Sequence, residues 1–490
     1  MAVDDMLAIY SPAEAWEELQ SRRHSYYDLY NAPFSGDHRL LAQTALPGSF
    51  WKRGSKVKQH VPVAADIAAT SASLLFGEEP RFSIYDASDG DAEDSSQPRL
   101  DAILAGNGFV QKINEAAETA SAAGDVFLKC RYDQKALDMP SIQVVRGADG
   151  LAEYRLGQLQ CIHFFTVLKT DIKTGNVWRV YECYKPGAIE SMIFLGQGSS
   201  LGEEQPQLLE QLGMEPHVAT PTQMMLAAHI ANMKPSRLWL TDDKGRSDFE
   251  GLRDLLDSLD EIYTSWLRDI RLAKSRLIVP AEFLRRKPED MFADGSYKYE
   301  FDEDVETLVA LDMGNNDQEQ KITPSQFAIR SNEHSATYEM TLRTILSMAG
   351  YSPQTFGLDI SGNAESGTAR RIMEKKSLST NAKKQSYWKA PLENFLTAVM
   401  QLDKALYGNS AWQEDQSVQV EMRDPVVTGV SDIAGSVSLL RNAQAASTDT
   451  LVKMLHPDWQ QAKVDEEVQK IIQENGLREM ADLNAGDDEA

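Results

Sequence analysis

Hydrophobic residues recur with two different spacings along this chain, and the change of spacing separates helical regions from strand-rich ones. Helical spacing, with apolar residues three or four positions apart, marks the stretches 12–30, 60–76, 108–123, 247–275 and 332–349. Between residues 125 and 196 apolar and polar residues alternate and are rich in β-branched and aromatic side chains, which predicts antiparallel strands. Short helices are expected at 431–445, 448–455 and 460–475. The pattern therefore predicts an α+β fold.

A glycine-rich stretch precedes the longest predicted helix. The segment GYSPQTFGLDISGNAESG, residues 350–367, contains four glycines, and glycine adopts the positive φ angles that helices exclude. From Thr368 to Tyr407 the spacing becomes helical, with an apolar stripe that includes Leu392, Phe395, Leu396, Val399, Leu402 and Leu406. Pro391 cannot donate a backbone hydrogen bond, so a kink is expected near Tyr387 to Ala390. We expect a polar loop mounted between two helices.

Two segments carry the signature of a capping box, in which a Ser and a Glu three residues later satisfy the first backbone groups of a helix. They are Ser11-Pro12-Ala13-Glu14 and Ser247-Asp248-Phe249-Glu250. The second predicts a helix that starts at Ser247 and ends near Ser275. Within it, Asp254, Asp257 and Glu261 are spaced to share one face. No partner His or second acidic cluster has ligand spacing, so a solvated or channel-lining face is favoured over a metal site.

Length and charge narrow the function classes. At 490 residues the chain is expected to form about three or four units. It has 49 basic and 74 acidic residues, a net charge of −25, which disfavours tight binding to nucleic acid. The acidic excess fits either solubility alone or a surface that repels DNA and lets it slide. No apolar run approaches the roughly 18 residues of a membrane span, and no leader pattern is present, so we expect no membrane partner and a cytosolic chain.

Motifs of catalysis and of cofactor binding are missing. The sequence has no phosphate-binding G-x-x-x-x-G-K-[ST] segment, no G-x-S-x-G elbow and no H-E-x-x-H pattern, so we expect neither an enzyme nor a cofactor. Cys130, Cys161 and Cys183 form no C-x-x-C pair, which argues against zinc and favours buried thiols. His163 falls in an apolar strand and is expected to be a hydrogen-bonded core imidazole rather than a ligand.

A basic run resembles a nucleic-acid patch at first sight. It comprises Arg370, Arg371, Lys375, Lys376, Lys383 and Lys384. These residues spread around the predicted helix and are offset by Glu374. A solvated face, or pairing with an acidic neighbouring subunit, is therefore favoured.

Three segments, in the same order along the chain, resemble the SPP1-type portal proteins of tailed bacteriophages. They are HVPVAADIAATSASLLFGEEPRFSI (60–84), GRSDFEGLRDLLDSLDEIYTSWLRDIRLAKSRLIVP (245–280), and the GYSPQTFG loop followed by SGTARR (350–371). The resemblance implies a multi-domain portal fold with long stem helices, an antiparallel β-rich wing, a small α/β clip and a helical crown.

The resemblance also implies domain boundaries. They are a wing (1–240), a stem helix (241–280), a clip (281–330), a second stem helix (331–349), a tunnel loop (350–367), a kinked wing helix and strand (368–430), and a crown with an acidic tail (431–490).

The implied function is a portal, or head-tail connector. Such a protein forms a ring, commonly dodecameric, at one capsid vertex of the virion after assembly in the host cytoplasm. Double-stranded DNA passes through the ring during packaging and ejection without being read for its sequence. The implied protein partners are the terminase large subunit, a head-tail adaptor, and the major capsid and scaffold proteins.

The resemblance places functional roles on particular residues. The tunnel loop would border the DNA with Ser361, Gly362, Asn363, Ala364, Glu365 and Ser366. The clip would bind partners through Arg285, Arg286 and Lys287, and the acidic stem face would be Asp254, Asp257 and Glu261. Two rival hypotheses are a metal-dependent nuclease or packaging-motor subunit that uses those three carboxylates, and a capsid scaffold protein without a central hole.

Overall fold

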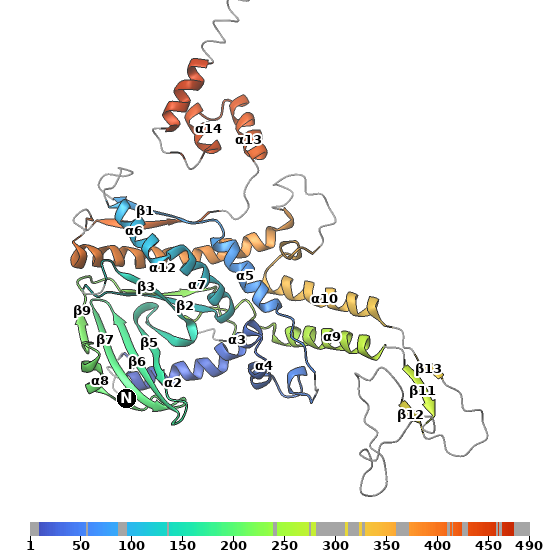
Figure 1. Cartoon of the computed structure of the whole chain (residues 1–490). Coiled ribbons are helices and arrows are strands. Elements are labelled where there is room, and N and C mark those ends of the chain that lie inside the picture. Colours follow the sequence, from blue (N-terminus) through green and yellow to red (C-terminus); the bar gives the residue numbers. More distant parts are fainter. Residues whose placement is uncertain are drawn as a thin grey trace, which may run out of the picture. The chain divides into compact units, whose positions relative to one another are not determined.

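The structure is a computed structural model of the whole chain (Figure 1). It describes residues 9–54, 57–86, 96–134, 137–238, 243–273, 276–280, 309–311, 323–325, 329–358, 372–408, 412–413, 415–423, 430–456, 459 and 463–474. The chain divides into two compact units. The first unit is Met1–Tyr351 with Thr380–Arg423, and the second is Ser352–Ser379 with Asp424–Ala490.

The N-terminal helix begins with the predicted capping box. Ser11 Oγ accepts from the backbone N–H of Glu14, and a Glu14 carboxylate oxygen accepts from the Ser11 N–H at 2.8 Å. Helix α2 (Pro12–Arg22) continues through a π-helical turn (Arg23–Tyr27) into α3 (Asp28–Ser35). The helical stretch is thus longer than the pattern predicted, because Gly36 with φ of 65° is the residue that ends it.

The core of the first unit is built from helices that the periodicity identified. Their bounds are α5 (Val63–Phe76), α7 (Phe109–Ala123) and α12 (Lys375–Tyr407), the last of which crosses into the second unit at its start. The predicted stripe of α12 is confirmed because it is buried from Leu392 to Leu402. The helix continues through Pro391, and the kink stays a prediction. Two short helices, α4 (His38–Thr44) and α6 (Gln97–Asn107), were not predicted.

Two antiparallel sheets fill the β-rich region. The first has the order β10-β2-β3, and the second is six-stranded, with β4 to β8 in sequence order and β9 beside β7. The predicted strands are confirmed as β2 (Asp125–Arg131), β3 (Ser141–Arg146), β5 (Gln158–Thr170), β6 (Asn176–Lys185) and β7 (Ala188–Gln197). The pattern missed β4 (Gly150–Arg155), β8 (Glu203–Glu204), β9 (His217–Ala219) and β10 (Ala227–Ala231), together with the short helix α8 (Pro206–Gln211).

A third pairing joins distant parts of the chain. Strand β1 (Arg81–Asp86) runs antiparallel to β14 (Gln416–Glu421). The edge of β14 is tied to α12, because Thr397 Oγ1 accepts from the Val418 N–H at 3.0 Å and Glu393 accepts from the Val420 N–H at 3.1 Å. The N-terminal and C-terminal portions of this unit therefore share one core.

Two helices, α9 (Arg253–Leu272) and α10 (Ser331–Ala349), lie side by side in Figure 1. Gly350 ends α10 in the left-handed conformation, with φ of 101°. The insert between the helices contributes β11 (Arg276–Pro280), paired in parallel with β12 (Val309–Leu311) and antiparallel with β13 (Thr323–Ser325).

The described C-terminal part of the second unit is helical, as expected. It contains α13 (Val430–Asn442), α14 (Thr448–Leu455) and a helix over residues 463–474. Helix α14 has a side-chain cap, since Ser447 Oγ accepts from the Thr450 N–H. Within the residues that the structure describes, none of the helices combines the length and apolar character needed to cross a membrane.

A buried carboxylate fastens the segment before α5 to α9. Asp260 is buried and accepts from the Trp51 indole at 3.0 Å and from the Val61 N–H at 2.8 Å. His60 bonds to the same carboxylate through Nδ1 at 2.9 Å and to the Pro33 carbonyl through Nε2 at 3.1 Å. Burial opposes the charged ring, but these two acceptors raise the pKa of His60 above its usual value.

The shifted pKa of His60 predicts a pH dependence of stability. A histidine whose folded pKa is raised stabilises the fold fully below its unfolded pKa of about 6.5, and this stabilisation is lost as the pH rises through the folded value. The difference in free energy of unfolding between the wild type and His60→Gln should therefore shrink as the pH rises through that window. Denaturation series at several pH values measure it. The exposed His217→Gln variant is the control, and a difference that grows with pH would contradict the assignment.

Candidate functional site

The α9–α10 pair is held by an aromatic and ionic seam. Tyr263 faces Tyr338 with ring centroids 6.2 Å apart, and Trp266 stacks on His334 at 6.2 Å with the planes only 9° apart. The residue numbers fall on α9 as they rise on α10, so the helices are antiparallel. One turn further along, Asp269 accepts from His334 at 2.9 Å and from Arg330 at 2.7 Å.

The three predicted stem carboxylates do not share one solvated face. Asp257 is buried and pairs with Arg253 at 3.3 Å, and burial raises its pKa above the usual value. Glu261 reaches Arg53 at 2.8 Å, while Asp254 is exposed. The prediction is wrong for Asp257, because the first turns of α9 pack into the core. A nuclease site would need the three groups to converge, and their separate partners do not favour it.

Helix α9 also begins later than the predicted capping box. Ser247 and Glu250 do not cap it, since its first helical residue is Arg253 and Leu252 makes no side-chain cap. Glu250 instead accepts from Tyr26 Oη at 2.6 Å, and the Ser247 N–H donates to the same hydroxyl at 2.8 Å. The sequence pattern is present, but the Glu250 carboxylate and the Ser247 N–H form hydrogen bonds with Tyr26 of the N-terminal helical stretch instead of capping α9.

The residue between them, Asp248, is the centre of a buried polar cluster. Lys384 on α12 donates to Asp248 Oδ2 at 2.5 Å, and Tyr351 donates to it at 2.8 Å. Ser121 on α7 donates at 2.6 Å, and the Asn232 amide donates to Oδ1 at 2.9 Å. We call the set the Asp248 anchor; its members are Ser71, Ser121, Asn232, Asp248, Tyr351 and Lys384.

The anchor joins the three segments that carry the family resemblance. Ser71 lies in the first segment, Asp248 in the second and Tyr351 in the third, and Lys384 donates to all three, reaching Ser71 at 2.5 Å and Tyr351 at 3.0 Å. Burial lowers the pKa of Lys384 and raises that of Tyr351 well above its usual value. The anchor fixes where α5, α12 and the end of α10 meet the chain that leads into α9.

Lys384 corrects the prediction made for the basic run. It is buried rather than on a solvated face, whereas its neighbour Lys383 is exposed. The signal that could have shown this is spacing: Lys384 stands four residues before Trp388 and eight before Leu392, on the buried side of α12. A lysine on the buried face of a helix needs a buried hydrogen-bond acceptor. The sequence alone does not show that this acceptor is Asp248.

The glycine-rich loop is described only at its flanks. In the second unit, the Ser352 N–H donates to Ser377 Oγ at 2.8 Å, and Thr355 Oγ1 lies 2.8 Å from the same hydroxyl. The chain on the two sides of the loop is therefore hydrogen-bonded together. The predicted DNA-bordering residues Ser361 to Ser366 lie outside the described residues, as do the clip residues Arg285, Arg286 and Lys287.

Most of the chain matches one protein family. Residues 17–476 match the family of phage portal proteins described as SPP1 Gp6-like. The chain therefore belongs to this family, as the three sequence segments indicated. No match was found among curated proteins.

Solved structures from gene transfer agent (GTA) particles also resemble the chain, at 13% sequence identity. For the neck of an empty GTA particle, with C6 symmetry, the TM-score is 0.42 over 85% of this chain and 93% of that chain. The neck of a native particle, with C12 symmetry, gives 0.39 over 81% and 90%. The virion of a native particle gives 0.39 over 85% and 98%.

The Asp248 anchor predicts a large stability effect. Lys384→Met leaves a buried carboxylate without its counter-charge, and this should lower the free energy of unfolding by about 3 to 5 kcal/mol. Chemical denaturation followed by tryptophan fluorescence measures it. The adjacent exposed Lys383→Met is the control and should change stability by less than about 0.5 kcal/mol. If the two substitutions lowered the free energy of unfolding equally, the buried ion pair of the anchor would not be the cause.

Proposed function

We propose that this protein is the portal of a tailed phage or phage-like particle. Copies of the chain form a ring, dodecameric as is common in the family, at one capsid vertex. Double-stranded DNA passes through the ring during packaging and ejection. The observation that carries this proposal is the family match over residues 17–476.

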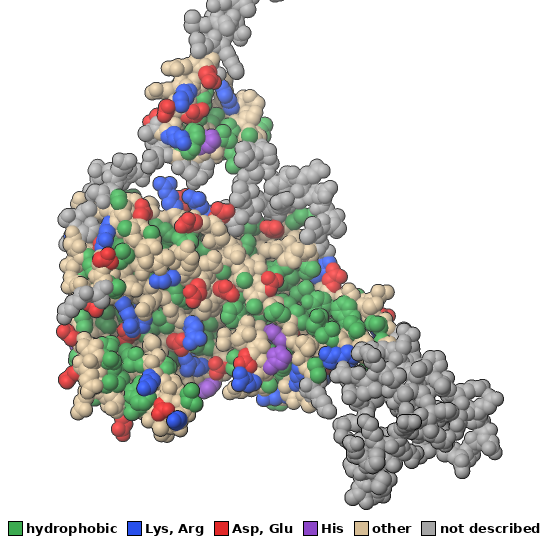
Figure 2. All heavy atoms as spheres, in the orientation of Figure 1, with side chains coloured by type: hydrophobic (Ala, Val, Ile, Leu, Met, Phe, Trp, Pro, Cys, Tyr) green, Lys and Arg blue, Asp and Glu red, His purple; other side chains and the backbone are tan. Residues whose placement is uncertain are grey.

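The surface of the α9–α10 pair supports a ring. Met340 and Met348 on α10 are 73% and 63% exposed, and Ile270 on α9 is 44% exposed. An open groove along α10 is lined by Met340 and Met348, together with Ala336, Glu339, Arg343, Thr344 and Ser347. Figure 2 shows hydrophobic side chains gathered over this helix pair. Large apolar side chains on one helical face mark an interaction surface, and the occupant that fits a ring is a second copy of this chain.

Charge supports passage of DNA rather than tight binding. The chain carries a net charge of −25, so a ring of copies is strongly acidic overall, which disfavours tight binding of phosphates. Like charges repel, and a polyanion inside such a ring forms few of the counterion-releasing contacts that would arrest it. Ser361, Gly362, Asn363, Ala364, Glu365 and Ser366 form the tunnel loop of this proposal. Small side chains and one carboxylate can follow a duplex without reading its bases.

The remaining partners follow from the portal role. The insert 281–330, with Arg285, Arg286 and Lys287, forms the clip that meets the terminase large subunit and later a head-tail adaptor. The crown, residues 431–490, faces the capsid interior, and the wing, residues 1–240, meets the major capsid and scaffold proteins. In this proposal α9 and α10 are the stem helices that link clip and wing.

The subunit interface can be tested on α10. Met340→Asp places a charge where a neighbour should pack. Because burying a methionine side chain contributes about 1.5 to 3 kcal/mol, ring formation should weaken by at least about tenfold per contact. Particle images and mass photometry of the purified protein give the fraction of rings. Ile172→Asp is the control, since Ile172 is 94% exposed in the turn between β5 and β6. Wild-type preparations without rings would overturn the proposal.

The tunnel loop can be tested by its removal. Deleting residues 361–366 should leave rings intact, because the Asp248 anchor and the bonded flanks of the loop are outside the deletion. Packaging should fall severalfold, measured as DNA protected from nuclease inside assembled particles. Ring images of the same variant provide the internal control. Packaging at the wild-type level would contradict the role of the loop.

A further inference from the structure

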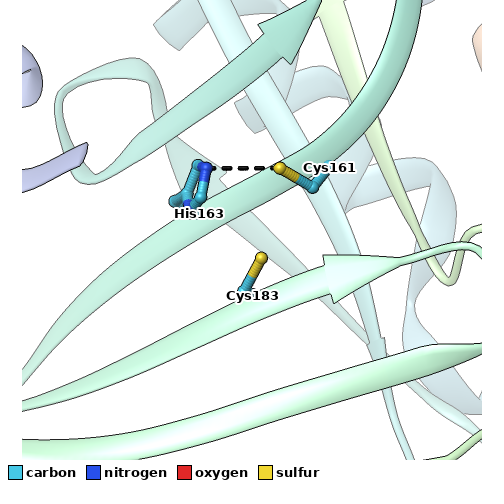
Figure 3. Close-up of side chains that lie close together, drawn as sticks. All are labelled: Cys161, His163 and Cys183. Atoms are coloured by element: carbon cyan, nitrogen blue, oxygen red, sulfur yellow. Dashed lines mark hydrogen bonds between the residues drawn. The ribbon is translucent and has the colours of Figure 1, made fainter. Parts of the chain in front are cut away.

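Two cysteines and a histidine meet between neighbouring strands of the six-stranded sheet. Cys161 and His163 lie two residues apart on β5 and so share a face, and Cys183 on β6 stands opposite His163 in the antiparallel register. All three side chains are buried. Their ligand atoms, the two sulfurs and a ring nitrogen, lie within 4.8 Å of one another (Figure 3).

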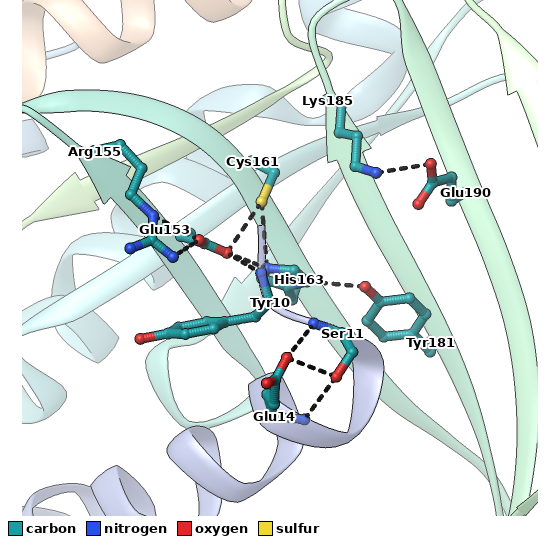
Figure 4. A network of polar contacts seen from close by, with 10 residues as sticks. All are labelled: Tyr10, Ser11, Glu14, Glu153, Arg155, Cys161, His163, Tyr181, Lys185 and Glu190. Atoms are coloured by element: carbon teal, nitrogen blue, oxygen red, sulfur yellow. Dashed lines mark hydrogen bonds and ion pairs between the residues drawn. The ribbon is translucent and has the colours of Figure 1, made fainter. Parts of the chain in front are cut away.

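A carboxylate from the next strand contacts two members of the group, Cys161 and His163. Glu153 on β4 is the register partner of Cys161 on β5. Its Oε2 lies 3.1 Å from His163 Nε2 and 3.7 Å from Cys161 Sγ, and that sulfur lies 3.2 Å from the same nitrogen (Figure 4). In a tetrahedral zinc site, with bonds of about 2.0 to 2.3 Å, ligand atoms stand about 3.3 to 3.8 Å apart. These three separations differ from that range by only a few tenths of an ångström, and Cys183 Sγ lies within 4.8 Å of the Cys161 and His163 ligand atoms.

We propose that Cys161, Cys183 and His163 bind a structural zinc ion, with Glu153, which contacts His163 and Cys161, as the fourth ligand. Zinc prefers four ligands of this kind in a closed tetrahedron, and sites with four protein ligands are structural because they leave no position for substrate. Zinc binds the thiolate form of cysteine, so the two thiols release their protons when the ion binds.

The surrounding residues orient the ligands as zinc sites require. His163 Nδ1 lies 2.9 Å from Tyr181 Oη, a partner that orients the ring and can accept the Nδ1–H when Nε2 binds an ion in place of its contact with Glu153. Arg155 donates to the other Glu153 oxygen, Oε1, at 2.6 Å, and the Tyr10 N–H donates to Oε2 at 3.0 Å. The imidazole and the carboxylate are thereby held in place before any ion arrives.

Charge balance also fits a dication. Two thiolates and a carboxylate carry three negative charges, and Zn²⁺ with the paired Arg155 guanidinium carries three positive ones, so the buried group is neutral as a whole.

Such an ion would cross-link β4, β5 and β6 at the point where the N-terminal segment meets the sheet. The link to that segment is the Tyr10 N–H, one residue before the cap of α2. Because the ligands are buried, the ion would enter as the chain folds. This inference is independent of the proposed portal function.

The test uses Co²⁺ as a spectroscopic probe of the full-length protein. Protein purified under reducing conditions is freed of metal with a chelator and titrated with Co²⁺. We expect one ion per chain, with the strong visible bands of tetrahedral Co²⁺, a near-ultraviolet thiolate charge-transfer band, and displacement of both by Zn²⁺. The Cys161→Ser/Cys183→Ser double variant should lose these bands. Cys130→Ser is the matched control, because Cys130 is buried on β2 outside the cluster and its substitution should leave the bands unchanged.

A second variant keeps the test decisive if the double variant does not fold. His163→Cys retains a ligand atom at the position of the imidazole, so it should still bind Co²⁺ and its charge-transfer band should intensify in step with the added thiolate. An unchanged band in His163→Cys would overturn the site. So would the absence of a tetrahedral spectrum in the wild type, or the same spectrum in the folded double variant.

Discussion

The ion pair between Asp248 and Lys384 is the constraint on which the arrangement of the first unit depends. Both groups are buried, and burying a charge is unfavourable unless its partner and hydrogen bonds are in place. Asp248 obtains them only when α7, α12, the end of α10 and the chain before α9 come together. A cluster of this kind adds little net stability, but it penalises every alternative packing in which one member is left alone.

The anchor also organises the regions to which the portal proposal assigns function. Tyr351 follows α10 directly, Asp248 precedes α9, and Tyr351 and Lys384 stand on either side of the loop segment in the sequence. The stem helices and the loop of the proposal are therefore all attached to the chain close to one rigid point. A loop that must border a moving polymer needs a fixed base, and the hydrogen bonds of Ser377 to both Ser352 and Thr355 draw its two flanks together.

Sequence patterns predicted the elements well and their contacts poorly. Strong periodicity gave α5, α7, α10 and α12, and alternation gave β5 to β7, because both patterns are local. The capping box at Ser247 misled because Tyr26, more than two hundred residues away, takes its polar groups. The cysteines seemed unrelated for the same reason: Cys183 meets Cys161 and His163 only through strand register, which linear spacing does not show. The tunnel-loop and clip residues lie outside the described structure, so those assignments rest on the family alone.

The seam between α9 and α10 has a mechanical consequence. Its aromatic pairs and the Asp269 contacts occur at successive turns, so the two helices cannot slide past each other by one turn, about 5.4 Å, without breaking all of them at once. Sliding of one helix along the other is therefore opposed until all of these contacts break together. The two helices should therefore move as one rigid body. A force applied to the insert, at one end of the pair, would be transmitted along the helix axes to the buried end of α9.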